Sequence, residues 1–199
     1  MDTPTGQIAV EALKVGDTIR TSDGKDVELR WVGNRKITRF EIKRDPDLRP
    51  VRISAGALGN SVPSRDLWVS PNHKILVRDW RAELLFSEEE VLVPAKALID
   101  GGHVIQDTSV NETEYFHLLF ENHEIILTEG APTESFFPGP YSLRMLVPEK
   151  RAELLELFPD LLDVGYGDFA RPCLTPKEGR FLRPSAGKSE QIEPLRRIA

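Results

Sequence analysis

The chain has 199 residues, of which 40% are hydrophobic and 29% charged, a composition typical of one globular domain with or without an appendage. Lys and Arg number 26 against 32 Asp and Glu, a net charge of −6, which argues against nucleic acid and a membrane surface as partners. A single cysteine excludes an intramolecular disulfide and a cysteine-based zinc site, and no apolar run approaches the ~18 residues of a membrane span.

Short apolar runs alternate with turn residues from residue 3 to residue 139, which predicts an all-β domain. Ser22-Asp23-Gly24 is a hairpin signal, because Asp and Gly tolerate positive φ, and one long return strand is expected over 27–37. Further strands are predicted over 51–53, 67–69, 74–77, 91–93, 115–120 and 123–127, with Glu121-Asn122 as a two-residue connection between the last two.

Helix is expected only late in the chain. Pro148 and Glu149 make a good helix start, since Pro loses no hydrogen bond there and an acidic first turn suits the helix dipole. An apolar face then recurs at helical spacing, in Leu154, Leu155, Phe158, Leu161 and Leu162. We therefore predict a β domain over 1–140, a short helical appendage packed on it over 141–184, and a flexible tail over 185–199.

One internal echo stands out. Residues 12–19 and 97–104 share the frame Ala-Leu-x-x-Gly-x-x-Ile/Val. Two copies are too few for a solenoid, so the frame indicates one domain built from two related β halves. Because only four positions are fixed, chance coincidence is the alternative.

Several segments taken together resemble the Hint domain, the module shared by inteins and hedgehog autoprocessing segments, and most closely its bacterial stand-alone branch. The similarity runs from Thr3 to about Cys173 and includes Thr3-Pro4-Thr5-Gly6, Leu13-x-x-Gly16-Asp17, Ser70-Pro71-Asn72-His73, 128–135 and 170–174. The resemblance implies a flattened all-β horseshoe with pseudo-twofold symmetry, and the echo would be the remnant of that symmetry.

The resemblance also implies a chemistry. In the family, a Cys or Ser at the start of the domain attacks the peptide bond joining it to an upstream segment, and the His of a Thr-x-x-His segment assists at the scissile nitrogen. Ser70-x-x-His73 matches that segment, with Ser for Thr. His117 lies where the family often has Asp, so it is a candidate second proton carrier. The alternatives are a half-buried structural histidine at 73 and an ordinary strand residue at 117.

The departures from the family pattern limit this chemistry. The family's final His-Asn is replaced by Glu134-Ser135, so asparagine cyclisation and splicing are excluded. The chain opens with Met1-Asp2, after the position of the nucleophile, so as written we expect it to be inert. The first hypothesis is an autoprocessing domain that cleaves in cis at its own N-terminal border, with its upstream segment as partner. The alternative is a catalytically degenerate Hint-fold structural or interaction module of a larger bacterial protein.

Other features indicate no additional function. The four histidines lack ligand spacing, so neither a metal nor a cofactor is predicted: His73, His103, His117 and His123. Cys173 is far from the domain start, so we expect it to act as a small buried hydrophobic residue. We expect His123 to make a structural hydrogen bond. Because Met1-Asp2-Thr3-Pro4 does not resemble a signal peptide, we expect a cytoplasmic protein or one secreted by a leaderless route.

Overall fold

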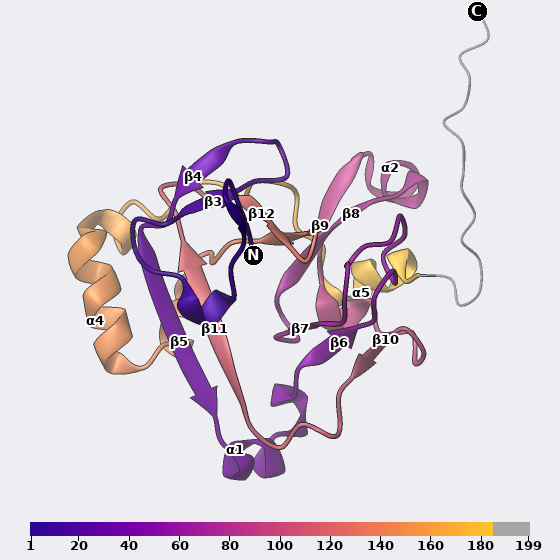
Figure 1. Cartoon of the computed structure of the whole chain (residues 1–199), viewed down its shortest axis with the longest axis horizontal. Coiled ribbons are helices and arrows are strands. Elements are labelled where there is room, and N and C mark those ends of the chain that lie inside the picture. Colours follow the sequence, from indigo (N-terminus) through magenta and orange to yellow (C-terminus); the bar gives the residue numbers. More distant parts are fainter. Residues whose placement is uncertain (185–199) are drawn as a thin grey trace, which may run out of the picture.

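The computed structural model describes residues 1–184, in which short strands dominate (Figure 1). The strands are β1 (Asp2–Thr3), β2 (Gly6–Gln7), β3 (Thr18–Arg20), β4 (Asp26–Glu28), β5 (Trp31–Ile37), β6 (Val51–Ile53), β7 (Leu67–Val69), β8 (Lys74–Arg78), β9 (Glu90–Pro94), β10 (Val104–Gln106), β11 (Thr113–Leu119), β12 (Ile125–Thr128) and β13 (Ala131–Glu134). They form a four-stranded sheet in the order β12-β13-β8-β9, a three-stranded sheet β10-β6-β7, and the pairs β11-β5, β3-β4 and β1-β2. The predicted all-β class is confirmed.

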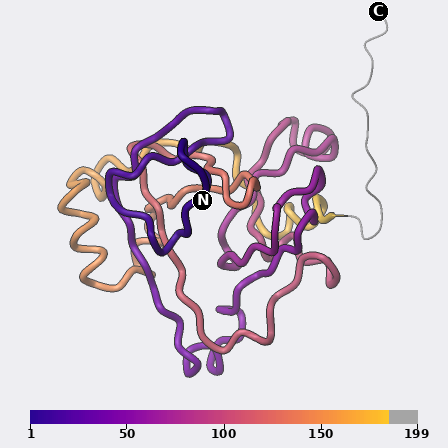
Figure 2. The backbone as a smooth tube through the Cα atoms, in the orientation of Figure 1, coloured from indigo at the N-terminus to yellow at the C-terminus, as the bar shows by residue number. Residues whose placement is uncertain are grey.

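The sheets are arranged as two sides of an open horseshoe. The long antiparallel ribbon of β5 and β11 forms one side, and the sheet of β6, β7 and β10 lies on the other (Figure 1). The backbone trace shows that the two sides come together at the end that carries α1 (Arg39–Arg44) (Figure 2). The largest apolar cluster fills the second side, where β6, β7, β9 and β10 bury Val, Ile and Leu side chains.

Two helices interrupt the β region, so the prediction that helix comes only late is wrong. The first, α1, begins with a capping box, in which Thr38 and Glu41 exchange side-chain and backbone hydrogen bonds. The second, α2 (Trp80–Phe86), is capped by the Asp79 side chain. The later helices are α3 (Pro140–Met145), α4 (Pro148–Leu157) and α5 (Pro176–Gly179), with 3-10 turns η1 (Val10–Ala12), η2 (Pro46–Leu48), η3 (Ala95–Ala97), η4 (Pro159–Leu161) and η5 (Arg180–Leu182). No helix within residues 1–184 is long and apolar enough to cross a membrane.

Strand pairing corrects two further predictions. The expected single strand over 27–37 is two strands, because buried Leu29 bonds to the Gly16 and Asp17 backbone before the chain turns to pair with β11. The expected connection at Glu121-Asn122 joins no hairpin, since β11 pairs with β5 and β12 pairs with β13. The β12–β13 turn is instead Glu129-Gly130, with φ of 52° and 76°.

The two copies of the internal frame follow the same path. Each begins with a 3-10 turn, η1 or η3, and each continues into a strand, β3 or β10. Leu13 and Leu98 are both buried, and Gly16 and Gly101 both have positive φ, at 93° and 81°. This agreement supports two related halves.

The segment after β13 packs on the β5–β11 ribbon. As predicted, α4 begins at Pro148, and Leu154 and Leu161 are buried in a cluster with Trp31 and Leu119. Leu162 does not join the apolar face, because it is 60% exposed. The division at residues 140 and 184 stays a prediction, and the predicted tail, 185–199, lies outside the described residues.

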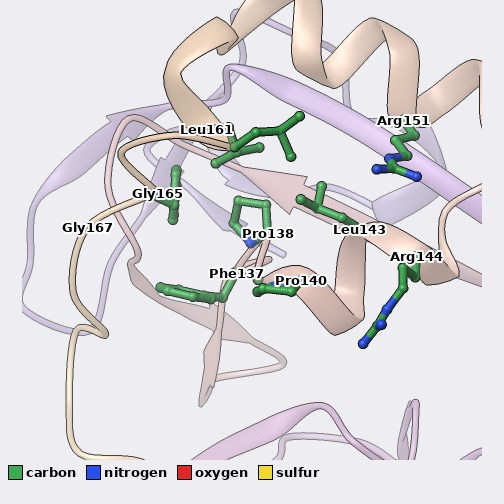
Figure 3. A pocket seen from close by; sticks show the side chains of 12 residues that line it. Phe137, Pro138, Pro140, Leu143, Arg144, Arg151, Leu161, Gly165 and Gly167 are labelled. Carbon is green, nitrogen blue, oxygen red and sulfur yellow. The ribbon is translucent and has the colours of Figure 1, made fainter.

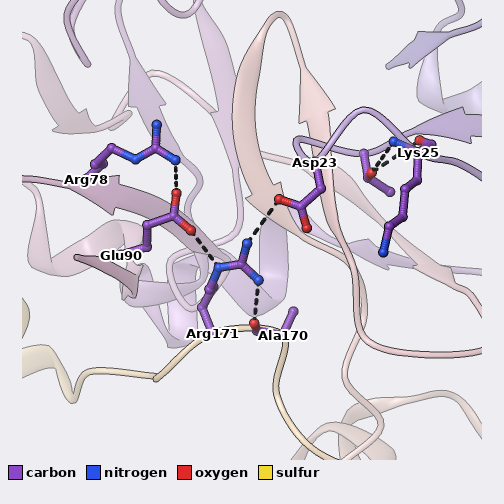
Figure 4. Close-up of polar contacts among 7 residues, drawn as sticks. Asp23, Lys25, Arg78, Glu90, Ala170 and Arg171 are labelled. Atoms are coloured by element: carbon purple, nitrogen blue, oxygen red, sulfur yellow. Dashed lines mark hydrogen bonds and ion pairs between the residues drawn. The ribbon is translucent and has the colours of Figure 1, made fainter. Parts of the chain in front are cut away.

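Arg171 fastens the last part of this segment to the β domain (Figure 4). Its guanidinium bonds to Glu90 of β9 at 2.6 Å and to Asp23 of the β3–β4 turn at 3.0 Å. Glu90 also pairs with Arg78 of β8, so one carboxylate joins two arginines. Residues 171–174 thereby run beside β9, where Leu92 bonds to the Pro172 and Leu174 backbone.

Candidate functional site

His73 lies on the turn that leads from β7 into β8. The backbone N–H of His73 donates to the Ser70 carbonyl at 3.0 Å, and the backbone carbonyl of His73 accepts the Ala95 N–H at 2.9 Å. These two bonds fix the backbone on both sides of the His73 Cα. Ser70 and His73 are both partly buried. Burial lowers the pKa of His73, and the charges of Lys74 and His123 lower it further against the opposing effect of Glu134. The imidazole is therefore neutral at pH 7.

His117 comes to the same place from β11. It pairs with Gly33 of β5, and its ring packs against Phe136 with centroids 4.7 Å apart. Burial lowers the pKa of His117 to about 4, and the charge of His73, when it is protonated, and the charge of Arg35 lower it further. Phe136 follows Glu134 by two positions, and Glu134 bonds to Lys74, the residue after His73, so strand β13 brings His73 and His117 into one region although their numbers differ by 44 (117 − 73).

A buried charged cluster lies beside His73 on the four-stranded sheet, where β8 begins and β13 ends. Glu134, at the end of β13, accepts the Lys74 N–H at 2.9 Å and the Lys74 ammonium at 2.7 Å. His123 Nε2 lies 3.6 Å from the same carboxylate, while its Nδ1 accepts the Ala170 N–H at 3.0 Å. This bond fixes the proton of the neutral ring on Nε2, facing Glu134. The predicted structural hydrogen bond of His123 is confirmed.

The cluster keeps Glu134 ionised. Burial alone raises the pKa of a carboxyl group, but the His123 ring, whose Nε2 lies 3.6 Å away, and the positive charge of Lys74 hold the pKa of Glu134 below its ordinary value. Phe169 covers Lys74, with the ammonium 5.2 Å from the ring centre. The negative carboxylate next to His73 therefore stabilises an imidazolium if His73 takes up a proton.

The pKa of His117 predicts a loss of stability in mild acid. An unfolded histidine takes up a proton near pH 6.5, whereas folded His117 does so only near pH 4. Between these values the unfolded state binds more protons, so stability falls as pH falls. From pH 7 to pH 5 we expect His117 to contribute a loss of about 1–2 kcal/mol, with partial exposure discounted.

Urea unfolding of the wild type and His117→Gln at both pH values measures this contribution. The variant should lose less stability than the wild type by that amount. His103→Gln, which alters an exposed histidine, should keep the full pH dependence. If the wild type and His117→Gln lose the same free energy of unfolding between pH 7 and pH 5, the lowered pKa of His117 is contradicted.

The other two residues that the sequence analysis considered, Cys173 and His103, are not assigned a role in the site. Cys173 is partly buried near Lys74 and Glu134, and burial raises its pKa to about 11, so it is a thiol at neutral pH. His103 is exposed. Within residues 1–184 no group of three or more His, Cys, Asp or Glu side chains is arranged to hold a metal ion.

Sequence reasoning missed the role of Glu134 and Lys74. Glu134 figured only as the replacement of a family residue, and Lys74 was not singled out. The available signal was a lone carboxylate between Thr133 and the aromatic pair Phe136-Phe137, a context that is typical of a buried, paired charge. Its partner lies 60 residues earlier in the chain and so was not visible.

The comparison with protein families identifies one match. A family model described as the Hint domain matches residues 1–140. This range covers more than half of the chain and contains His73, His117 and the Glu134 cluster. No curated protein matches the chain.

Proposed function

The chain belongs to the Hint domain family, and from this premise we propose that it is an autoprocessing domain that cleaves the polypeptide at its own N-terminal border without splicing. The observation that carries the proposal is that β13 and the residues after it bring His73 and His117 into one region, through the Lys74–Glu134 bond and the packing of Phe136 on His117. Two imidazoles from distant parts of the chain are partly buried and neutral near pH 7, so each ring has an unprotonated nitrogen that can accept a hydrogen bond or a proton during the reaction.

The first step is an acyl shift. A Cys or Ser side chain at the family position attacks the carbonyl carbon of the peptide bond before it, and the C–N bond breaks. The nucleophile's proton passes through neutral His73 to the departing nitrogen, which leaves as a free amine. Protonating this nitrogen removes the resonance that protects an amide. The product is a thioester or an ester.

The second step resolves that intermediate. Water adds to the acyl carbon, the upstream segment leaves as a carboxylic acid, and the thiol or hydroxyl regains its proton. Ser70 is assigned to polarise the scissile carbonyl, and His117 to act as the second proton carrier. Cleavage without splicing follows from Glu134-Ser135, since no asparagine stands there to cyclise.

The test extends the chain upstream so that a Cys at the family position is preceded by a peptide tag. Mass spectrometry then follows release of the tag with and without added thiol. We expect release, accelerated by thiol, and its loss in His73→Gln. The matched control His103→Gln should cleave like the unmodified extension, because its histidine is exposed and outside the site.

Two results overturn the proposal. One is an extended protein that stays intact under all thiol conditions although circular dichroism shows it to be folded. The other is release that continues unchanged in His73→Gln. The first result favours the alternative, a degenerate Hint-fold module with a structural or interaction role.

A further inference from the structure

A cavity of about 430 Å³ lies between the segment that follows β13 and the loop that follows η4 (Figure 3). Its walls are mainly apolar and include Phe137, Pro138, Leu143, Leu161 and Tyr166. The Tyr166 hydroxyl is occupied, because it donates to the Phe120 carbonyl at 2.7 Å. The volume falls within the range of about 300–1,000 Å³ that is usual for small-molecule sites.

Two arginines give this apolar cavity a charged edge. Arg144 of α3 and Arg151 of α4 both line it, and Figure 3 shows them on the same side. No acidic residue is among the lining residues. The ion pair on α4 joins Lys150 to Glu153, and within residues 1–184 neither arginine has a carboxylate within ion-pair distance. The positive charge at the cavity is therefore uncompensated by the described residues.

Uncompensated guanidinium groups beside an apolar wall select a particular chemistry. A guanidinium binds a carboxylate through two parallel hydrogen bonds, and the apolar wall favours a hydrocarbon body. We propose that this cavity binds a free carboxylic acid with an aliphatic body of medium length, its carboxylate at Arg144 and Arg151. The aliphatic body of this acid packs against Leu143 and Leu161.

The residues that line the cavity do not include His73, His117 or Glu134. Its arginines and the 161–167 loop lie beyond residue 140, where the match to the Hint family ends. Phe137 links the two regions, because it lines the cavity, stacks on Phe169 at 3.9 Å and meets His123 edge-on at 5.4 Å. The proposal therefore stands whether or not the domain cleaves itself.

Calorimetric titration of the full chain with octanoate tests the proposal, with octanol as the neutral ligand of equal length. We expect one octanoate per chain and at least tenfold weaker binding of octanol. Arg144→Gln/Arg151→Gln should weaken octanoate binding tenfold or more. The matched control Arg39→Gln/Arg44→Gln removes two exposed arginines from α1, which does not line the cavity, and should bind like the wild type.

The possible contrary results are distinct. Equal binding of octanoate and octanol, or wild-type binding by Arg144→Gln/Arg151→Gln, overturns the assignment of the arginines. Absence of octanoate binding at millimolar concentration overturns the site. Co-sedimentation with phosphatidylglycerol vesicles that depends on the same arginines, without octanoate binding, assigns them to a lipid surface and overturns the free-acid proposal.

Discussion

Replacing Glu134 with alanine is expected to lower the free energy of unfolding by about 3–5 kcal/mol, the usual effect of removing one partner from a buried ion pair. The Glu134 and Lys74 side chains are only 10% and 20% exposed, so the ammonium left behind is poorly hydrated. The Lys74 N–H also loses its acceptor. Urea unfolding at pH 7, followed by tryptophan fluorescence, measures the loss.

Two variants distinguish the stranded charge from a general loss of packing. Glu153→Ala removes the acid of the exposed Lys150–Glu153 pair and should cost less than about 1 kcal/mol. Adding Lys74→Met to Glu134→Ala should restore part of the lost stability, because it removes the unpaired ammonium. If the double variant is as unstable as the sum of the single variants, the coupling between the two charges is absent.

Gly33→Ala is expected to cost about 3 kcal/mol, the upper end of the usual range for overpacking a core. A Cβ at Gly33 would lie 2.1 Å from the ring of Trp31, which is fully buried. That ring packs with Phe136 at 5.8 Å, and Phe136 packs with His117. The substitution should therefore displace His117 as well as destabilise the fold, which urea unfolding and the histidine NMR resonances will report.

The matched control for this effect is Gly102→Ala. The nearest atom to a Cβ at Gly102 is an Asp100 oxygen at 3.9 Å, which is an ordinary contact, so this variant should unfold like the wild type. Shortening the ring with Trp31→Leu should make Gly33→Ala less costly. A Gly33→Ala protein with unchanged stability contradicts the tight contact between Gly33 and Trp31.

The fold was predictable where the signal was local. Gly24 and its neighbours predicted the β3–β4 turn, and Pro148 predicted the start of α4. The helix α1 was missed because six residues are too few for a helical period, and its stability comes from the Thr38–Glu41 capping box and from burial of Ile42. Strand β13 was missed because Ala-Pro-Thr-Glu has low strand propensity and is held by pairing with β12 and β8.

The site was predictable only where a motif marked it. Ser70-x-x-His73 singled out His73 by resemblance, and the contacts of Glu134 with Lys74 and of Phe136 with His117 bring it into the same region as His117. The pair Lys74–Glu134 was not predictable, because it depends on the register that sets Thr133 opposite Ile75. Cross-strand register is decided by the assembled sheet, so no short window of sequence contains that information.

The way in which residues 166–174 cross the sheet has a practical consequence for anyone who grafts this module onto another protein. The Ala170 N–H donates the hydrogen bond that orients His123, and the backbone of Cys173 forms a parallel β-bridge with Leu92. A graft that stops at residue 140, where the family match ends, would leave the Glu134 side of the sheet open to water and its apolar neighbours free to aggregate. A graft should therefore keep residues 166–174 as well.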